Sequence, residues 1–256
     1  MLGEATAAAW RSAVASLCSG FAAAMAALCP LPASADPPEA YGWREVWAGA
    51  DASNHVWLAY SGATIAPYSD MFSDGLRLRI ATGFGEYSYT GERNAKEQSF
   101  SARTGFADAL IGYLNRAGPL TTKAFVGISA IEHDVRPHDP QNPVQGRAYG
   151  PKAVVELWLN MGENMWSSLD AGWTSAHATY AGRLRTDYRL FDDVSLGIEA
   201  RVNGNALDKD ARGGVFIRYA WHRGEISLAG GLAGRFFEDA NDMHDPYATL
   251  CWLLQF

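Results

Sequence analysis

The sequence predicts an all-β fold, an antiparallel transmembrane β-barrel of about 12 strands that follows a cleaved signal peptide. Three observations support this prediction: the pattern of the last strand, the alternation of many segments of about ten residues, and the character of the first 35 residues. The last strand, Tyr247–Phe256, places four apolar residues on one face, and these are Leu250, Trp252, Leu254 and Phe256. Such an aromatic ending is typical of the closing strand of a bacterial outer-membrane barrel, because a strand that faces lipid needs an apolar residue at every second position.

The first 35 residues have the features of a secretory signal. Arg11 precedes an Ala-rich run over residues 12–28, and the small residues at 33–35 offer a cleavage site. We therefore expect residues 1–35 to be a signal peptide and residues 36–256 to form the barrel domain. An uncleaved anchor helix is the alternative, although Ser and Gly interrupt the run, which barely has the length needed to span a bilayer.

Composition restricts the class of protein further. The chain has 26 Gly, 9 Trp, 11 Tyr and 11 Phe, which favours a β architecture. Its formal net charge of −7 argues against nucleic acid as a partner. The chain after residue 35 contains no long apolar run, which excludes a helical membrane protein but not a barrel. Cys18 and Cys29 lie in the signal, so the mature chain keeps only Cys251 and cannot form an intramolecular disulfide.

Alternation with a period of two residues is clearest over residues 75–85. One face is mainly apolar and the other carries Arg, Ala and Gly; the apolar face consists of Leu76, Leu78, Ile80, Thr82 and Phe84. The same pattern returns over residues 183–190 and 194–203. One face therefore suits lipid, and the other suits a wet or packed lumen.

Reading every alternating run in order predicts 12 strands of the ~10 residues expected for a tilted transmembrane strand. They lie near 43–51, 55–66, 75–88, 103–115, 120–133, 149–161, 165–176, 180–191, 194–203, 212–222, 225–236 and 247–256. Short connections alternate with longer polar loops, which are predicted at 89–102, 134–148, 204–211 and 237–246. Short periplasmic turns and long outer loops are usual for barrels. Residues 66–74 are long for a periplasmic turn, and the hairpins near 51–55 and 176–180 are short for outer loops, which leaves a ten-strand count open.

A soluble β-barrel or sandwich is the rival interpretation, since its strands also alternate. A soluble fold would bury its apolar face and expose its charged face to water. Here the polar face carries many Gly and Ala beside its charges. Small residues among charges fit a concave lumen better than a convex surface, so the membrane barrel is favoured.

Several blocks of sequence resemble the BcsS family of cellulose biosynthesis proteins. They are H-D-P-Q-N-P-V-Q-G-R-A-Y-G-P-K-A-V-V-E-L-W-L-N from His138, V-W-A-G-A-D from Val46, W-S-S-L-D-A-G-W from Trp166, Y-A-G-R from Tyr180 and R-G-G-V-F-I-R-Y from Arg212. The resemblance covers roughly residues 46–234. It implies an outer-membrane barrel associated with bacterial cellulose production and secretion, and it implies no catalytic residues.

Inward-facing aromatic residues are the feature most relevant to a glucan. They are Trp47, Phe125, Trp158 and Trp166, near Lys123, Glu156 and Asp170. The flat C–H faces of pyranose rings stack on aromatic rings, and flanking carboxylates bind their hydroxyls. The alternative is that these rings fill the barrel, because a barrel of about twelve strands lies between the packed eight-stranded kind and the open porins.

Charged residues of both signs also fall on the predicted lumen face. They are Arg77, Arg79, Glu156, Asp170, Arg183, Arg185, Asp187, Arg189, Glu199, Arg201 and Arg218. An anion-selective pore would need its positive residues unpaired at a constriction. Structural ion pairs are the favoured interpretation, since charges in a narrow lumen lose water and need partners.

Two further groups of residues contain side chains of the types used in metal binding and in lipid hydrolysis. The segment from Glu132 to Asp134, with His138 and Asp139, has ligand types that a divalent metal accepts, but three prolines keep the loop extended and favour a solvated outer loop without metal. Ser175 and His177, two residues apart on one strand face, suggest a lipid hydrolase. No acidic partner is placed for them, so no catalytic residue is assigned.

The sequence therefore favours a non-enzymatic outer-membrane barrel accessory to cellulose biosynthesis, as a surface anchor, a conduit or an assembly partner. The alternatives are a general small-solute pore and, less favoured by the sequence, an outer-membrane enzyme acting on lipid or glycan. No cofactor and no metal are expected. The expected partners are outer-membrane lipid and the barrel-assembly machinery, to which the resemblance adds cellulose and the cellulose-secretion subunits.

Overall fold

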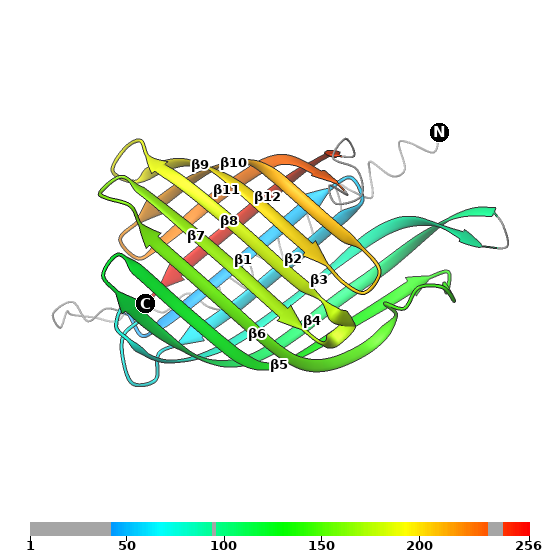
Figure 1. Cartoon of the computed structure of the whole chain (residues 1–256), viewed down its shortest axis with the longest axis horizontal. Helices are drawn as coiled ribbons and strands as arrows, with labels where there is room; N and C mark the ends of the chain where they lie inside the picture. The colour runs from blue at the N-terminus through cyan, green and yellow to red at the C-terminus, as the bar shows by residue number, and fades with distance from the viewer. Residues whose placement is uncertain (1–41, 94–95, 235–242) are drawn as a thin grey trace, which may run out of the picture. The chain divides into compact units, whose positions relative to one another are not determined.

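The chain folds into a closed antiparallel β-barrel of 12 strands (Figure 1). A computed structural model describes residues 42–93, 96–234 and 243–256, so the predicted signal peptide lies outside the described residues. The strands are β1 (Arg44–Ser53), β2 (Val56–Ile65), β3 (Gly75–Arg93), β4 (Lys96–Ala117), β5 (Leu120–Arg136), β6 (Gly146–Asn160), β7 (Met165–Thr174), β8 (Tyr180–Arg189), β9 (Val194–Gly204), β10 (Lys209–Trp221), β11 (Gly224–Gly234) and β12 (Met243–Gln255). Each strand pairs with the next, and β12 closes the barrel on β1. The predicted fold class and the count of 12 strands are confirmed.

The outer face of the strands is apolar, as the alternation predicted. In β5, Val126 and Ile128 are 61% and 68% exposed, whereas Phe125 on the opposite face is only 2% exposed. In the closing strand, Leu250 is exposed while Thr249 is buried, which puts the predicted apolar face outward. Large exposed apolar side chains occur on the same face of the other strands, for example Ile80, Ile198 and Val215. This continuous apolar surface matches the lipid-facing band of a transmembrane barrel.

Turn lengths distinguish the two ends of the barrel. One end carries the tight turns at residues 118–119, 161–164, 190–193 and 222–223. Gly118 there has a φ of +61°, a conformation that glycine adopts without steric cost. The other end carries the loop at 137–145 and the hairpin of β3 and β4, which projects from the barrel (Figure 1). Short turns mark the periplasmic end of such barrels, so the projecting hairpin is on the outer side.

The predicted outer loop at 89–102 is wrong, because β3 and β4 continue as a hairpin through nearly all of it. Phe100, Ala102 and Val135 form a buried cluster against which Tyr87 and Tyr89 pack. The apolar residues of β3 and of β4 in this cluster occupy every second position of their strands, as in the rest of the barrel. The alternation of inward and outward side chains therefore extends beyond the apolar band. The predicted loops at 134–148 and 204–211 are also shorter than expected, at 137–145 and 205–208.

The long inner connection at residues 66–74 is held in place by Arg77. This side chain is fully buried and donates hydrogen bonds to Ser69 Oγ at 2.9 Å and to the carbonyl oxygen of Asp70 at 2.9 Å. It also donates to the carbonyl oxygens of Leu76 and Ser73. The connection is therefore an ordered element, which explains how a barrel accommodates so long an inner turn. No helix in the described part of the chain has the length and apolar character needed to cross a membrane.

Candidate functional site

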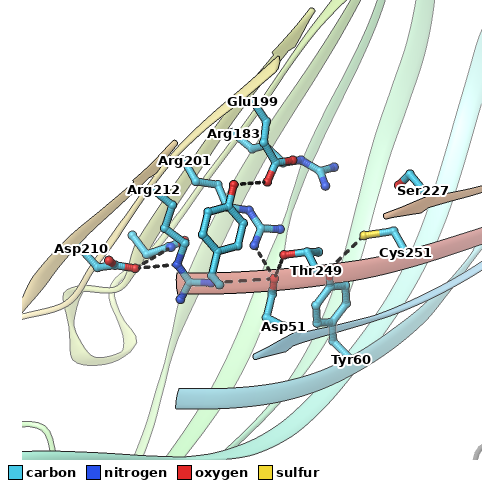
Figure 2. A network of polar contacts seen from close by, with 12 residues as sticks. Asp51, Tyr60, Arg183, Glu199, Arg201, Asp210, Arg212, Ser227, Thr249 and Cys251 are labelled. Carbon is cyan, nitrogen blue, oxygen red and sulfur yellow. Dashed lines mark hydrogen bonds and ion pairs between the residues drawn. The ribbon is translucent and has the colours of Figure 1, made fainter. Parts of the chain in front are cut away.

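The barrel lumen is the candidate site, because polar and aromatic side chains from all around the barrel converge there. Asp51 of β1 is the centre of one network (Figure 2). It accepts a hydrogen bond from Nη1 of Arg201 at 2.7 Å and another from the Thr249 hydroxyl, and Arg212 lies 3.9 Å away. Strands β10, β11 and β12 separate β1 from Arg201 in β9, so this ion pair crosses the lumen.

The same network continues around Glu199 of β9. Its carboxylate accepts a hydrogen bond from Nε of Arg185 at 2.8 Å and one from the Tyr247 hydroxyl at 2.9 Å. Tyr247 lies in β12, with β10 and β11 between it and Glu199. Arg185 and Glu199 are both almost fully buried, with side-chain exposures of 6% and 0%. Charges held so far from water need such partners, because an unpaired buried charge is strongly destabilising.

A second network lies around Glu156 of β6. Arg79 of β3 makes two hydrogen bonds to its carboxylate, of which the one from Nη2 to Oε2 is 3.1 Å long. Lys123 lies 3.7 Å from Glu156 and 3.9 Å from Glu45. Strands β2, β3 and β4 separate Glu45 from Lys123, so this contact also spans the lumen. The two networks therefore join strands that lie three or four places apart around the barrel.

The remaining predicted lumen charges occupy several environments. Asp170 pairs with Arg183 at 2.8 Å, and Arg218 pairs with Glu225 at 2.6 Å. Asp187 is buried, opposite Trp166 in the register of β7 and β8. Arg189 is exposed at the inner end of β8, and Arg77 binds the inner connection described above instead of a lumen carboxylate.

Sequence reasoning missed several members of these networks. They are Glu45, Asp51, Asp108, Lys152, Arg212 and Glu225. Lys152 pairs with Asp108 at 2.6 Å. Asp51 and Lys152 could have been found from alternation, because each occupies an inward position of its strand. Alternation assigns a residue to a face, however, and it cannot identify the residue on another strand with which that residue pairs.

The four predicted aromatic residues lie in three places. Trp158 and Trp166 stack on each other with ring centroids 3.9 Å apart and planes inclined by 19°. Arg218 lies over both rings, at 5.5 Å and 5.3 Å from their centroids. Phe125 is buried beneath the guanidinium of Arg79, and Trp47 packs against Tyr60 with centroids 6.2 Å apart. Protein groups therefore already contact the rings that could stack on a sugar.

A further cluster, here called the mouth cluster, lies at the outer end of the barrel on β3, β5, the loop at 137–145 and the turn before β8. The Tyr87 hydroxyl lies 3.1 Å from Nδ1 of His133, and the His133 ring packs edge-on against His177. The Tyr89 hydroxyl donates to Asp139 at 2.8 Å and accepts from Asn142 at 2.7 Å. The loop at 137–145 is thus folded onto the hairpin of β3 and β4. Burial, together with nearby His177, lowers the pKa of His133 to about 4.

Acidification is expected to loosen this mouth cluster. The folded-state pKa of His133 lies below the value near 6.5 of an unfolded chain, so between these values the unfolded state binds more protons. The stabilisation that depends on neutral His133 is therefore fully present above pH ~6.5 and decreases, by an amount on the order of 3 kcal/mol, as the pH drops towards 4. Hydrogen exchange, corrected for intrinsic rates, should show protection lost in residues 137–145 at pH 4.5 and retained at pH 7. His133→Asn should abolish the pH dependence, and equal protection of the wild type at both values would contradict the expectation.

The two groups that suggested metal binding and hydrolysis are not assembled as sites. Among the residues that the structure describes, no three His, Cys, Asp or Glu side chains are grouped to hold a metal ion. Ser175 and His177 do not share a strand face, because they lie at a 3₁₀ turn over Ala176–Ala178. Nε2 of His177 lies 3.4 Å from the carbonyl oxygen of Gly146.

A closed 12-strand barrel with an apolar outer band and a polar interior defines an integral β-barrel protein of the bacterial outer membrane. The chain belongs to the cellulose biosynthesis protein BcsS family, whose model matches residues 46–256. The family resemblance seen in the sequence is therefore confirmed. Membership associates the protein with bacterial cellulose biosynthesis. A search of the curated proteins finds no match to this chain.

Three solved structures with similar folds are distant from this chain in sequence. The transport unit of the autotransporter AIDA-I from Escherichia coli has 9% identity and a TM-score of 0.49, with 88% of this chain and 94% of that chain covered. The translocator domain of the autotransporter NalP from Neisseria meningitidis has 12% identity and a TM-score of 0.46, covering 86% and 90%. The KdgM porin in complex with disordered oligogalacturonate has 9% identity and a TM-score of 0.44, covering 83% and 99%. Nothing that those proteins bind extends to this chain at such identities.

Proposed function

We propose that this barrel is a non-enzymatic accessory of bacterial cellulose production, and that it acts in the outer membrane as an anchor or assembly partner. The observation that carries the proposal is the set of contacts between non-neighbouring strands across the lumen, above all those between Asp51 and Arg201 and between Arg79 and Glu156. A conduit for a glucan chain would need these contacts to open. Family membership supplies the link to cellulose, and the bridged lumen favours anchoring over transport.

Glucan contact remains part of this proposal, at the periplasmic mouth. Trp47 and Trp158 are only half-buried and lie near the inner ends of β1 and β6. Their accessible edges could pack on a pyranose ring that approaches from the periplasm. Trp166 would support Trp158, on which it stacks, and Phe125, which is buried beneath Arg79, would contribute only by packing.

A deletion strain and its complemented counterpart test the role in cellulose. An anchor predicts that the deletion releases cellulose into the medium with little change in total yield, and that the full-length gene restores attachment. Dye binding and enzymatic glucose release from cells and medium would measure both quantities. Unchanged cellulose in amount and location would contradict the accessory role. One polar substitution that abolishes a lipid or glycan modification, without altering heat-modifiable mobility, would contradict the non-enzymatic part.

Planar-bilayer recordings test the bridged lumen. The wild-type barrel is expected to show little steady conductance. Replacing Arg79 and Glu156 together with Ala removes a bridging pair without leaving one charge alone, and should raise conductance several-fold. The matched control removes the exposed pair of Asp134 and Arg136, whose side chains are 49% and 73% exposed on the outer face. Wild-type conductance of the size shown by open porins would favour the general pore instead.

A further inference from the structure

A groove of about 410 Å³ lies on the outward face of the barrel, over strands β4, β5 and β6. The register of the strands explains its shape. Ala107 pairs with Ala130, and Ala130 pairs with Tyr149, so a row of two small residues ends at an aromatic ring that is 70% exposed. In the next row towards the outer end, Phe84 pairs with Gly105. The floor is therefore made of small residues, and the exposed ring of Tyr149 forms a wall on one side.

The groove runs from the apolar band into the first outward-facing charges beyond it. Towards the membrane, the next outward residue of β5 is Ile128, which is 68% exposed. Towards the outside it is lined by Arg103, Glu132, Asp134 and Arg147. This change from apolar to charged residues marks the level of the lipid headgroups, where exposed aromatic residues such as Tyr149 are also enriched. Because the groove lies on the outward face of the barrel at this level, the lipid of the outer leaflet covers it.

The charges at the top of the groove leave donors for an anion. Glu132 is bound by Arg147, and Asp134 is bound by Arg136, so both carboxylates are neutralised. Arg147 donates to a single oxygen of Glu132 through Nε and Nη2 and also interacts with the Tyr149 side chain, and its own side chain remains 56% exposed. Arg103 approaches Glu86 at 3.6 Å, longer than a hydrogen bond, and its side chain is 73% exposed. Guanidinium groups bind phosphate through paired, charge-assisted hydrogen bonds.

We propose that this groove is a binding site for a phosphorylated glycolipid of the outer leaflet. An acyl chain lies along the floor of Gly105, Ala107 and Ala130, and a phosphate of the headgroup binds Arg103 and Arg147. The site would fix the barrel to the lipid beside the projecting hairpin of β3 and β4. It is separate from the lumen and does not depend on the proposed role in cellulose.

Binding of bisphosphoryl lipid A to the purified full-length mature barrel in detergent, measured by native mass spectrometry, tests the site. Lipid A with its phosphates removed has the same acyl chains and is expected to bind at least tenfold more weakly. Arg103→Gln with Arg147→Gln should weaken binding of the phosphorylated lipid about tenfold and abolish this preference. Gly105→Leu should also weaken binding about tenfold, because a Cβ there meets only the Gly83 carbonyl oxygen at 3.6 Å and the new side chain extends into the groove.

Two substitutions serve as matched controls. Gly213 is an outward glycine of β10 where an added Cβ would meet no atom of the described residues within 4 Å, and Arg189 is an exposed arginine at the inner end of β8, outside the groove lining. Gly213→Leu and Arg189→Gln should bind the lipid as the wild type does. Heat-modifiable mobility confirms that each variant is folded. If the wild-type barrel binds both forms of lipid A equally, the proposal is wrong. It is also wrong if the Arg103/Arg147 double variant and Gly105→Leu both bind the phosphorylated lipid as tightly as the wild type does.

Discussion

Asp51→Asn is expected to destabilise the barrel by about 3 kcal/mol or more, because the substitution leaves buried positive charge without its carboxylate. The side chains of Arg201 and Arg212 are 11% and 9% exposed, so water cannot replace the lost partner. The Thr249 hydroxyl also loses a charged acceptor. The quantity to measure is the midpoint of urea unfolding in lipid vesicles, together with the temperature at which the heat-modifiable band shifts.

The control for Asp51 is an exposed pair on the outer face. Asp134→Asn removes a carboxylate that is 49% exposed and should cost less than about 1 kcal/mol. Combining Asp51→Asn with Arg201→Gln should recover much of the lost stability, since Arg212 keeps its contact with Asp210 at 2.9 Å. Equal losses for Asp51→Asn and Asp134→Asn would show that the bridge across the lumen contributes little.

Val126→Arg should destabilise the membrane-inserted barrel by about 2–4 kcal/mol, since a charged side chain near the middle of the lipid band loses its hydration. Val126 is 61% exposed and lies midway between the inner turn at 118–119 and the first outward charge of β5, Glu132. Unfolding in lipid vesicles measures the loss, and yield in the outer-membrane fraction reports on assembly.

Two variants separate charge from other effects of this substitution. Val126→Leu keeps an apolar side chain and should cost little. Ser88→Arg places the same charge on β3 beyond Glu86, outside the apolar band, where about 0–1 kcal/mol is expected. A soluble barrel would tolerate Val126→Arg and Ser88→Arg equally, so equal effects would contradict the membrane assignment.

The projecting hairpin of β3 and β4 is the part of the fold that was not predicted from the sequence. All 12 strands were predicted near their observed positions, but residues 89–102 were interpreted as a loop because of their polar character. Tyr89 and Phe100 stack with centroids 5.1 Å apart and supply the packing that extends the strands. That packing depends on pairing between two segments, which a single polar segment does not reveal.

The outward groove was not predicted at all. Gly105, Ala107 and Ala130 are ordinary small residues in their own strands, and only the register of β4 with β5 sets them side by side. Arg103 and Arg147 are 44 positions apart in the chain and line one groove only because β5 lies between their strands. Sequence spacing gives no direct measure of such lateral proximity.

By itself the sequence determined the barrel class, the outward or inward face of most residues, and membership of the BcsS family. It could do so because the side chains of a β-strand alternate with a fixed period of two. A strand with lipid on one side therefore has an apolar residue at every second position of its sequence. Only the tertiary structure decided that Asp51 binds Arg201, 150 positions away, and that Trp158 covers Trp166. Closure of the sheet brings strands that are not neighbours within reach of each other's side chains, and the distance between them depends on strand number and register together.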